Sequence, residues 1–368
     1  MDLKKYYVGF SLIKGIGAIR MKALEDYFGD LESAWNAPIQ DLKESGLFEK
    51  ICERIAEVRK DFNLEAYYAN ILKSDVKILI KDDPQYPRQL LEIDQAPPVL
   101  YLKGDIIPED EWGVAIVGTR KVTHYGKQVS EEFSRTLADH GITIISGLAR
   151  GVDGIAHKTA LEAGGRTIAV LGSGVDRIYP AEHRGLAQEI MKNGAVISDY
   201  PPGTAPEASN FPPRNRIISA LSKVTIIIEA GATSGALITA EFAVNQGKTV
   251  YAVPGSIYNV QSKGTNRLIQ LGARPLLDIR EVLQDIQVDL VQERKAIRQE
   301  YPIDLFEEKI LNVLSAEPIH VDEITHLTQL PVSQISSYLA ILELKGLTKP
   351  VGGMKYVLVK ESFGGYET

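Results

Sequence analysis

Between Gly113 and about Leu277 the chain repeats one pattern, in which a short apolar run is followed by a stretch with helical spacing. These runs predict strands at Val114–Val117, Thr143–Ser146, Thr167–Leu171, Ala195–Ser198, Val224–Ile228 and Thr249–Val253. Helices are expected between them, for example over Lys127–Asp139 and Val152–Glu162. Short β-rich runs that alternate with helices are typical of an α/β fold with a doubly wound parallel sheet.

The bulk composition is that of an ordinary globular protein, with 368 residues, 44% hydrophobic and 24% charged, and a net charge of −7. An acidic chain is not coated with nucleic-acid-binding charge, although a local basic groove remains possible. The single cysteine, Cys52, gives neither an internal disulfide nor a Cys-based metal cluster. The N-terminus lacks the apolar core of a signal peptide, and no run is long enough to span a membrane, so we expect a cytoplasmic protein.

The chain before the sheet pattern, residues 1–72, reads as a small domain of short helices. The turn Leu12–Gly17, followed by the helical pattern Arg20–Phe28, has the form of a helix-hairpin-helix motif, whose backbone amides can hold a phosphate. A second hairpin is expected near Leu47, leading into Ile51–Phe62. A helical bundle used only for packing is the alternative, and it is favoured by nearby acidic residues: Glu25, Asp26, Asp30 and Glu32.

The prolines in Asp82–Pro87 and Pro97-Pro98 indicate turns and extended chain that lead into the sheet domain, which we place at 73–284. Residues 285–303 are polar and are predicted to be a linker. Residues 304–361 have the outline of a winged-helix domain, with helices over Glu307–Leu314, Val321–Leu327 and Val332–Leu344 and a two-stranded wing after them. The third helix offers serines and a glutamine and few cations, so contact with a protein or weak contact with DNA is expected of this domain.

Glycine-containing turns follow three of the predicted strands. The first turn is Gly118-Thr119-Arg120-Lys121, in which Gly118 permits close approach of a ligand and Arg120 can bind phosphate in a bidentate manner. The second runs from Ser146 to Asp153 and carries Arg150, and the third contains Gly172-Ser173-Gly174. The carboxyl ends of parallel strands share one edge of the sheet, so a set of cations is expected to converge on one rim: Arg120, Arg150, Arg214 and Arg216.

The segment Phe211–Gly255 contributes two more places suited to anions. Arg214, Asn215 and Arg216 form part of a basic loop at the head of a helix, where backbone N–H groups already favour negative charge. Ser234 and Gly235 follow the strand Val224–Ile228 and open a helix over Ala236–Gln246. The two places together predict a ligand that carries phosphate.

No known catalytic signature is present in the sequence. It contains no G-x-S-x-G, P-loop or H-E-x-x-H motif, and the dinucleotide fingerprint that a nicotinamide cofactor needs is also missing. Glu241 could act as a base, but a surface role is favoured for it. Asp153 is expected to cap or begin a helix, and His157 to lie in the core. The remaining histidines give no convincing metal site.

Six ordered motifs between Asp82 and about Leu277 carry a family resemblance. They read GTRKVTHYG, SGLARGVDGIAHKTAL, VLGSGVDRIYPAEH, FPPRNRIISALS, SGALITAEFAVNQGKTVYAVPG and SKGTNRLIQLGA. Together they resemble the DNA-processing protein A family (DprA, also called Smf), in the version with an N-terminal helical domain and a C-terminal winged helix. The resemblance implies an extended Rossmann-like core that binds single-stranded DNA, forms a homodimer and loads the recombinase RecA during natural transformation, without a cofactor or catalysis.

The resemblance also implies roles for individual residues. Gly118 and Arg120 match a phosphate-gripping turn that includes Thr119 and Lys121, with Arg150 on the next turn. The family's basic pocket, in which an aromatic ring can stack on a base, matches Phe211, Arg214, Asn215 and Arg216. Its pocket-lining turns match Gly172, Ser173, Ser234 and Gly235. The region of subunit contact matches Arg267, Leu268, Ile269, Leu271, Leu276 and Leu277.

Two other functions are compatible with parts of this pattern. The sheet edge also resembles LOG-type nucleoside-monophosphate phosphoribohydrolases, but the stretch AGATSGALITAE lacks their PGG-GT core. A hydrolase of that type would depend on Glu241. A pure scaffold that binds only protein is the third possibility, and it would tolerate the loss of Arg214 and Arg216.

Overall fold

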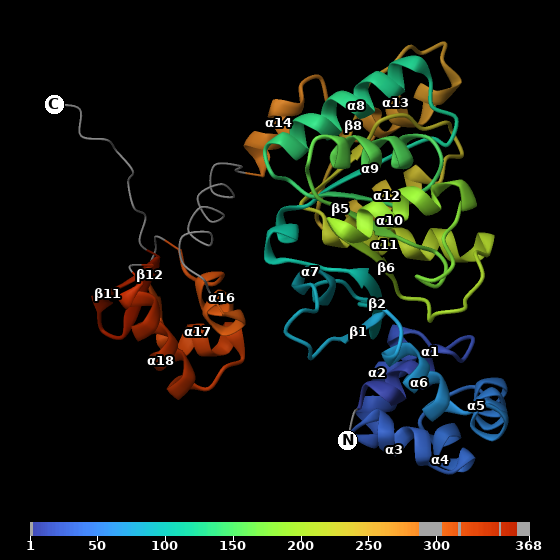
Figure 1. The fold of residues 1–368 in the computed structure, drawn as a ribbon, viewed down its shortest axis with the longest axis vertical. Helices are drawn as coiled ribbons and strands as arrows, with labels where there is room; N and C mark the ends of the chain where they lie inside the picture. The colour runs from blue at the N-terminus through green and yellow to red at the C-terminus, as the bar shows by residue number, and fades with distance from the viewer. Residues whose placement is uncertain (1–2, 287–303, 316–317, 346, 359–368) are drawn as a thin grey trace. The chain divides into compact units, whose positions relative to one another are not determined.

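The computed structural model describes residues 3–286, 304–315, 318–345 and 347–358. The chain forms two compact units, which divide at residues 291 and 292. The first unit contains the N-terminal helices and a nine-stranded sheet, and the second contains a small three-stranded sheet with helices (Figure 1).

The large sheet has the strand order β1-β2-β6-β5-β4-β3-β7-β8-β9. The strands from β3 to β9 are parallel, and they are β3 (Val114–Val117), β4 (Ile144–Ser146), β5 (Thr167–Val170), β6 (Gly194–Ser198), β7 (Val224–Ile227), β8 (Thr249–Ala252) and β9 (Arg274–Pro275). All six predicted strands are present, each within one residue at either end. The prediction of a doubly wound parallel sheet is therefore confirmed.

Helices cover both faces of this sheet because its strands are apolar on both sides. Ala115 and Val117 of β3 pack in one core with α11 (Phe211–Leu221) and α12 (Ala236–Asn245). Val114 and Ile116 of the same strand face a second core with the helices α8 (His124–Asp139), α9 (Val152–Glu162) and α14 (Ile279–Asp285). Helix α10 (Arg184–Lys192) packs against β5 and β6 in a smaller cluster. Helix α9 has the predicted bounds, whereas α8 begins three residues earlier than predicted because Thr123 caps it.

The segment interpreted as turns and extended chain also contributes to the sheet. Strands β1 (Lys77–Ile80) and β2 (Val99–Gly104) pair antiparallel, and β2 pairs antiparallel with β6. The prolines lie between these strands, around the short helix α7 (Arg88–Leu91), and Pro97 accepts a 2.6 Å hydrogen bond from the Tyr86 hydroxyl. Short strands that are interrupted by turns give no alternating pattern, so the sequence did not indicate them.

The N-terminal helices are α1 (Lys4–Ser11), α2 (Ala18–Phe28), α3 (Leu31–Asn36), α4 (Ile39–Glu44), α5 (Glu49–Asp61) and α6 (Leu64–Leu72). The predicted hairpin turn joins α1 to α2, and Gly15 in it has a φ of 102°. The core of this region continues into β1 and β2, where Val99 and Tyr101 are buried against the helices. The Tyr101 hydroxyl lies 2.8 Å from Ser11 Oγ. Figure 1 shows these helices beside the β1–β2 edge of the sheet.

The segment predicted to hold the subunit contact forms helix α13 (Lys263–Gln270) and the edge strand β9. Leu271 and Leu277 are 67% and 75% exposed, Arg267 is exposed, and Leu268 and Ile269 are half-buried. Leu276 is buried among residues of α8 and α14 in the core of its own chain. The prediction is therefore wrong for Leu276, because a side chain inside one copy cannot contact a second copy.

The second unit is a winged helix, as predicted. Its helices are α16 (Leu305–Leu311), α17 (Val321–Thr328) and α18 (Val332–Leu344), and its wing is formed by β11 (Thr348–Gly352) and β12 (Lys355–Leu358). A third strand, β10 (Ile319–His320), was not predicted and pairs with β12. Lys345, after α18, contacts both carboxylate oxygens of the buried Glu307 at 2.7 Å. Most of the predicted linker 285–303 and the end of the predicted domain at 361 lie outside the described residues.

His157 lies in the core, as expected, and its partner is Thr167. Thr167 Oγ1 donates to the carbonyl of Ile144 at 2.7 Å, so His157 Nδ1 donates to Thr167 Oγ1 across 2.6 Å. The Nε2 atom is buried and has no hydrogen-bond partner among the described residues. Burial lowers the pKa of His157 to about 3, so the folded protein holds a neutral ring.

This histidine predicts a loss of stability in mild acid. Below about pH 6.5 the unfolded chain binds a proton at His157 that the folded chain excludes until about pH 3, so folding becomes less favourable as the pH falls through this window. From pH 7 to pH 5 the contribution is about 2 kcal/mol. Urea unfolding at both pH values should show a smaller loss for His157→Asn than for the wild type. The exposed His124→Asn serves as control, and an equal loss in His157→Asn and wild type would contradict the assignment.

Candidate functional site

The strand order of the large sheet reverses beside β3. From β3 the chain adds β4, β5 and β6 on one side, and then returns to add β7 and β8 on the other. The loops after β3 and β7 therefore leave the sheet in opposite directions, and ligands of open α/β sheets bind in the crevice between such loops. A cavity of about 880 Å³ lies at this place, lined by Gly118–Lys121 after β3 and by Gly231–Gly235 after β7.

The first turns of helix α11 form another wall of this cavity, through Phe211, Arg214 and Asn215. The sequence FPPRNR was expected to be a basic loop ahead of a helix, but it is helical from Phe211 onward, with prolines in the first turn. Asn215 Nδ2 donates to the carbonyl of Gly235 at 3.3 Å, which links α11 to the start of α12. The loops after β3 and β7 and the starts of α11 and α12 thus all contribute to the wall of the cavity.

Positive charge dominates the lining of the cavity. Its ionisable residues are Arg120, Lys121, Arg214 and Lys263, against the single carboxylate of Asp153. Arg120, Lys121 and Lys263 are exposed and form no ion pair among the residues that the structure describes. A concave surface with uncompensated cations attracts anions and concentrates them locally.

Arg214 is held inside the protein, and burial lowers its pKa to about 10, so it stays charged at neutral pH. Its guanidinium donates to the carbonyls of Gly147, at 3.0 Å, and Val170, and to Asn215 Oδ1 at 3.2 Å. The buried Asp153, which accepts a 3.0 Å hydrogen bond from the Gly147 amide, lies near this charge and favours it. Burial raises the pKa of Asp153 above its usual value, and the nearby charge of Arg214 offsets only part of this effect.

The aromatic ring of Phe211 lies between two cations at the cavity wall. The guanidinium carbons of Arg120 and Arg214 lie 5.8 and 5.9 Å from the ring centroid, and the Tyr179 ring lies 5.7 Å from it. Gly172 lies behind Phe211, because a Cβ on Gly172 would come within 2.8 Å of the ring. Phe211 is therefore held in one position with part of its surface exposed.

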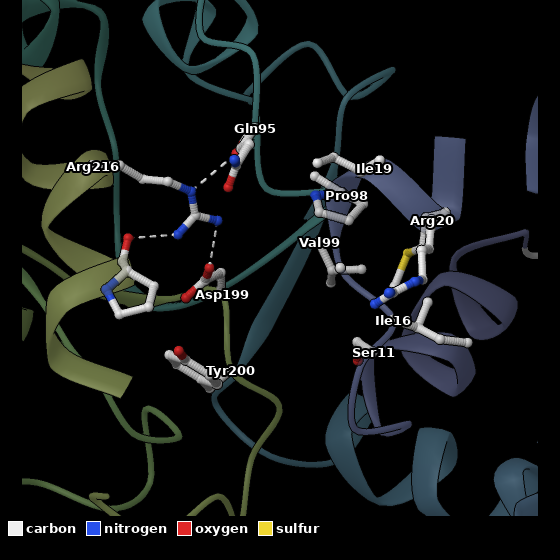
Figure 2. A pocket seen from close by; sticks show the side chains of 14 residues that line it. Ser11, Ile16, Ile19, Arg20, Gln95, Pro98, Val99, Asp199, Tyr200 and Arg216 are labelled. Atoms are coloured by element: carbon white, nitrogen blue, oxygen red, sulfur yellow. Dashed lines mark hydrogen bonds and ion pairs between the residues drawn. The ribbon is translucent and has the colours of Figure 1, made fainter. Parts of the chain in front are cut away.

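Arg216 does not belong to this cavity. Figure 2 shows it in another pocket, of about 420 Å³, between the sheet and the N-terminal helices. There its Nη2 pairs with Asp199 at 2.8 Å and its Nε donates to the Gln95 carbonyl at 3.0 Å. Residues two apart on a helix point to different faces, so Arg214 and Arg216 cannot converge. The prediction of one rim that includes Arg216 is wrong.

Other predicted pocket residues lie near the cavity without lining it. Arg150 pairs with Glu182 and lines a smaller neighbouring pocket with Arg120 and Arg214. Ser173 is buried and donates to the Arg177 carbonyl at 2.7 Å. The expectation that Gly172 and Ser173 line the pocket is therefore wrong, whereas the other predicted residues do line it: Gly118, Thr119, Arg120, Lys121, Phe211, Arg214, Asn215, Ser234 and Gly235.

The glycines of these turns are explained by packing of one turn on another. A Cβ on Gly118 would meet Val152 Cγ2 at 2.6 Å, so α9 packs closely against the Cβ side of this glycine. Gly151 has a φ of 77°, and a Cβ there would lie 2.3 Å from the Thr119 carbonyl oxygen. The turn after β4 is thereby pressed against the turn after β3.

The sequence did not single out Gln261 and Lys263, which also line the cavity. The Thr119 hydroxyl donates to Gln261 Oε1 at 2.8 Å, and the Gln261 carbonyl accepts a 2.7 Å bond from the Ala230 amide. The motif SKGTNRLIQLGA contained Lys263, but only the fold brings it to the same cavity as Arg120 and Lys121.

The carboxylates and histidines near the site are engaged elsewhere. Glu229 is buried, and its carboxylate accepts from the Thr123 amide at 2.9 Å and from the Thr123 hydroxyl at 2.6 Å, at the start of α8. Glu241 is exposed on α12 and does not line the cavity. Over the described ranges no group of three or more metal-binding side chains comes together, and no helix there is both long and apolar enough to cross a membrane.

The sequence matches two family descriptions. Residues 77–287 match DNA recombination-mediator protein A, and residues 298–354 match the DprA winged helix domain. The chain is 35% identical to protein Smf of Synechocystis sp., over 95% of this chain and 98% of that protein. It is 36% identical to protein Smf of Escherichia coli, over 85% of each, and 41% identical to DNA processing protein DprA of Bacillus subtilis, over 56% of this chain and 70% of that protein.

Two solved structures also match this fold. DNA processing protein A from Streptococcus pneumoniae matches with a TM-score of 0.67 and 32% identity, over 76% of this chain and 97% of that one. A structure that addresses the single-stranded DNA binding mode of DNA processing protein A from Helicobacter pylori matches with a TM-score of 0.53 and 34% identity, over 58% and 96%. With this fold, these motifs and these relatives, the chain belongs to the DprA/Smf family of DNA recombination mediators.

Proposed function

We propose that this protein binds single-stranded DNA in the cavity beside β3 and β7, and that it acts without catalysis as a mediator of recombination. The observation that carries the proposal is a set of three exposed cations, Arg120, Lys121 and Lys263, that form no ion pair with any described residue and line the same cavity as Phe211. Non-specific binding of a single strand needs cations for the phosphates and an aromatic face for the bases. The relative from Helicobacter pylori binds single-stranded DNA, which supports the same ligand here.

The distribution of charge supports a single strand over a duplex. The chain has a net charge of −7, so the attraction is confined to the cavity and its rim. Phe211 lies at the wall of a concave site, where an unpaired base can reach it but a base stacked inside a duplex cannot. Arg214 adds a buried positive charge 5.9 Å from the centroid of the ring and also bonds to the turn after β4.

Membership of the family also supports a more specific role in recombination. We propose that the protein protects incoming strands and loads RecA onto them in natural transformation or general recombination, in the cytoplasm. We also propose that the parts at 1–72, 73–284 and 304–361 have separate roles, with the DNA site in the second.

A homodimer would join two cavities and raise affinity for longer strands through multivalency. The surface for this contact would include Arg267, Leu268, Ile269, Leu271 and Leu277.

The DNA site predicts that single cations can be removed with a measurable change in salt dependence. Arg120→Ala, Lys121→Ala and Lys263→Ala should each weaken binding of a labelled oligo-dT and lower the slope of log affinity against log salt by about 0.7 for each lost phosphate contact. Fluorescence anisotropy over a salt series measures both quantities, with a duplex of equal length for comparison. Lys158→Ala, an exposed lysine on α9, is the matched control. Wild-type slopes in all three variants would refute the assignment of these cations.

The proposed dimer predicts a separate effect of the exposed leucines. Leu271→Asp and Leu277→Asp should shift sedimentation from dimer to monomer, because each change places a charge in an apolar contact. The fold should persist, since both side chains are largely exposed in one copy. Leu72→Asp, at the end of α6, also replaces an exposed leucine and should leave the dimer intact. Dimers of unchanged stability in both variants would place the contact elsewhere.

A further inference from the structure

The segment from Pro254 to Lys263, between β8 and α13, presents a cluster of apolar side chains to solvent. Ile257, Tyr258 and Val260 are 74%, 89% and 60% exposed. Tyr258 is thus an aromatic side chain with almost its whole surface in water. Large apolar side chains that are grouped on a surface commonly mark a binding site.

Hydrogen bonds fix the backbone of this segment on both sides. At its start, the Gly255 amide donates to Asn266 Oδ1 at 3.2 Å and the Gly255 carbonyl accepts from Asn266 Nδ2 at 2.9 Å. The Tyr125 hydroxyl donates to the Pro254 carbonyl at 3.0 Å. In its second half, Asn259 Oδ1 accepts from the Gln261 amide at 2.9 Å. The exposed side chains are therefore carried by an ordered loop.

The same segment forms part of the wall of the DNA cavity, through Val260, Gln261 and Lys263. Tyr258 is two residues from Val260, so their Cα atoms lie at most about 7.6 Å apart. Lys121 and Lys263, which form no ion pair in the described part of the chain, add exposed positive charge to this cavity. The exposed Tyr258 thus lies next to the part of the loop that lines the cationic cavity, while Phe211 lines the cavity itself.

We propose that Tyr258, with Ile257 beside it, is a second stacking site, which holds a base of the strand as that strand leaves the cavity. This inference rests on the proposed function and adds a position on the path of the DNA. The adjacent cations favour a polyanion over a second copy of this chain, because a symmetric contact would bring the same lysines of both copies together. An aromatic face on an ordered loop binds any base without sequence preference.

The test compares an oligo-dT with an abasic oligonucleotide of the same length, which keeps the phosphates and lacks the bases. Tyr258→Ala should weaken binding of oligo-dT on the order of 10-fold, since it removes a stacking face. Its affinity for the abasic strand and its salt slope should equal those of the wild type, because no charge changes. Tyr258→Phe should restore the affinity for oligo-dT. Tyr27→Ala, which removes an exposed tyrosine of α2, should have no effect.

Each other outcome has a distinct meaning. Equal affinity of Tyr258→Ala and wild type for oligo-dT would overturn the stacking site and leave the proposed function standing. A folded wild type that binds no oligo-dT would instead overturn the proposed function itself. Sedimentation of Tyr258→Ala as a monomer, where the wild type is a dimer, would assign the cluster to subunit contact and so contradict the proposal. An equal loss on the abasic strand would also contradict it, because the effect would not depend on a base.

Discussion

The arrangement of the site depends on one buried cation. Arg214 extends from the first turns of α11 to the ends of two neighbouring strands, where it donates to the carbonyls of Gly147 and Val170. A buried guanidinium is tolerated only when its donors are satisfied and a carboxylate lies nearby, and here Asp153 supplies the negative charge. The turns after β4 and β5, the start of α11 and the ring of Phe211 are therefore positioned together.

The alternation of strands and helices could be predicted from the sequence. The strands are short and apolar on both faces, whereas the helices carry apolar residues at helical spacing. The turns after the strands were also placed correctly at one edge of the sheet. The strands β1 and β2 were not predicted, since their position depends on the antiparallel pairing of β2 with the distant β6. The strand β10 is only two residues long and gives no pattern at all.

Within the site, the sequence indicated which residues are important better than it indicated where their side chains point. Arg214 and Arg216 looked equivalent in the sequence. Because of the helical period, Arg214 lies in the cavity wall and Arg216 pairs with Asp199. The sequence indicated no ion-pair partner for Arg150, but in the folded chain it pairs with Glu182. Gly118 lines the cavity as predicted, but the sequence did not indicate that Val152 packs against it. Such distinctions arise from neighbours that are far away in the sequence, and a local motif does not contain them.

The packing of the N-terminal helices on the β1–β2 edge has a consequence for how the chain can be divided. Val99 and Tyr101 of β2 belong to the same hydrophobic core as the helices, and the Ser11 and Tyr101 hydroxyls meet inside it. A truncated chain that starts after α6 would leave this apolar edge of the sheet in water, where it would favour aggregation. The helices and the edge of the sheet are therefore expected to unfold as one cooperative unit, and deletion studies of this protein need a replacement for that covering surface.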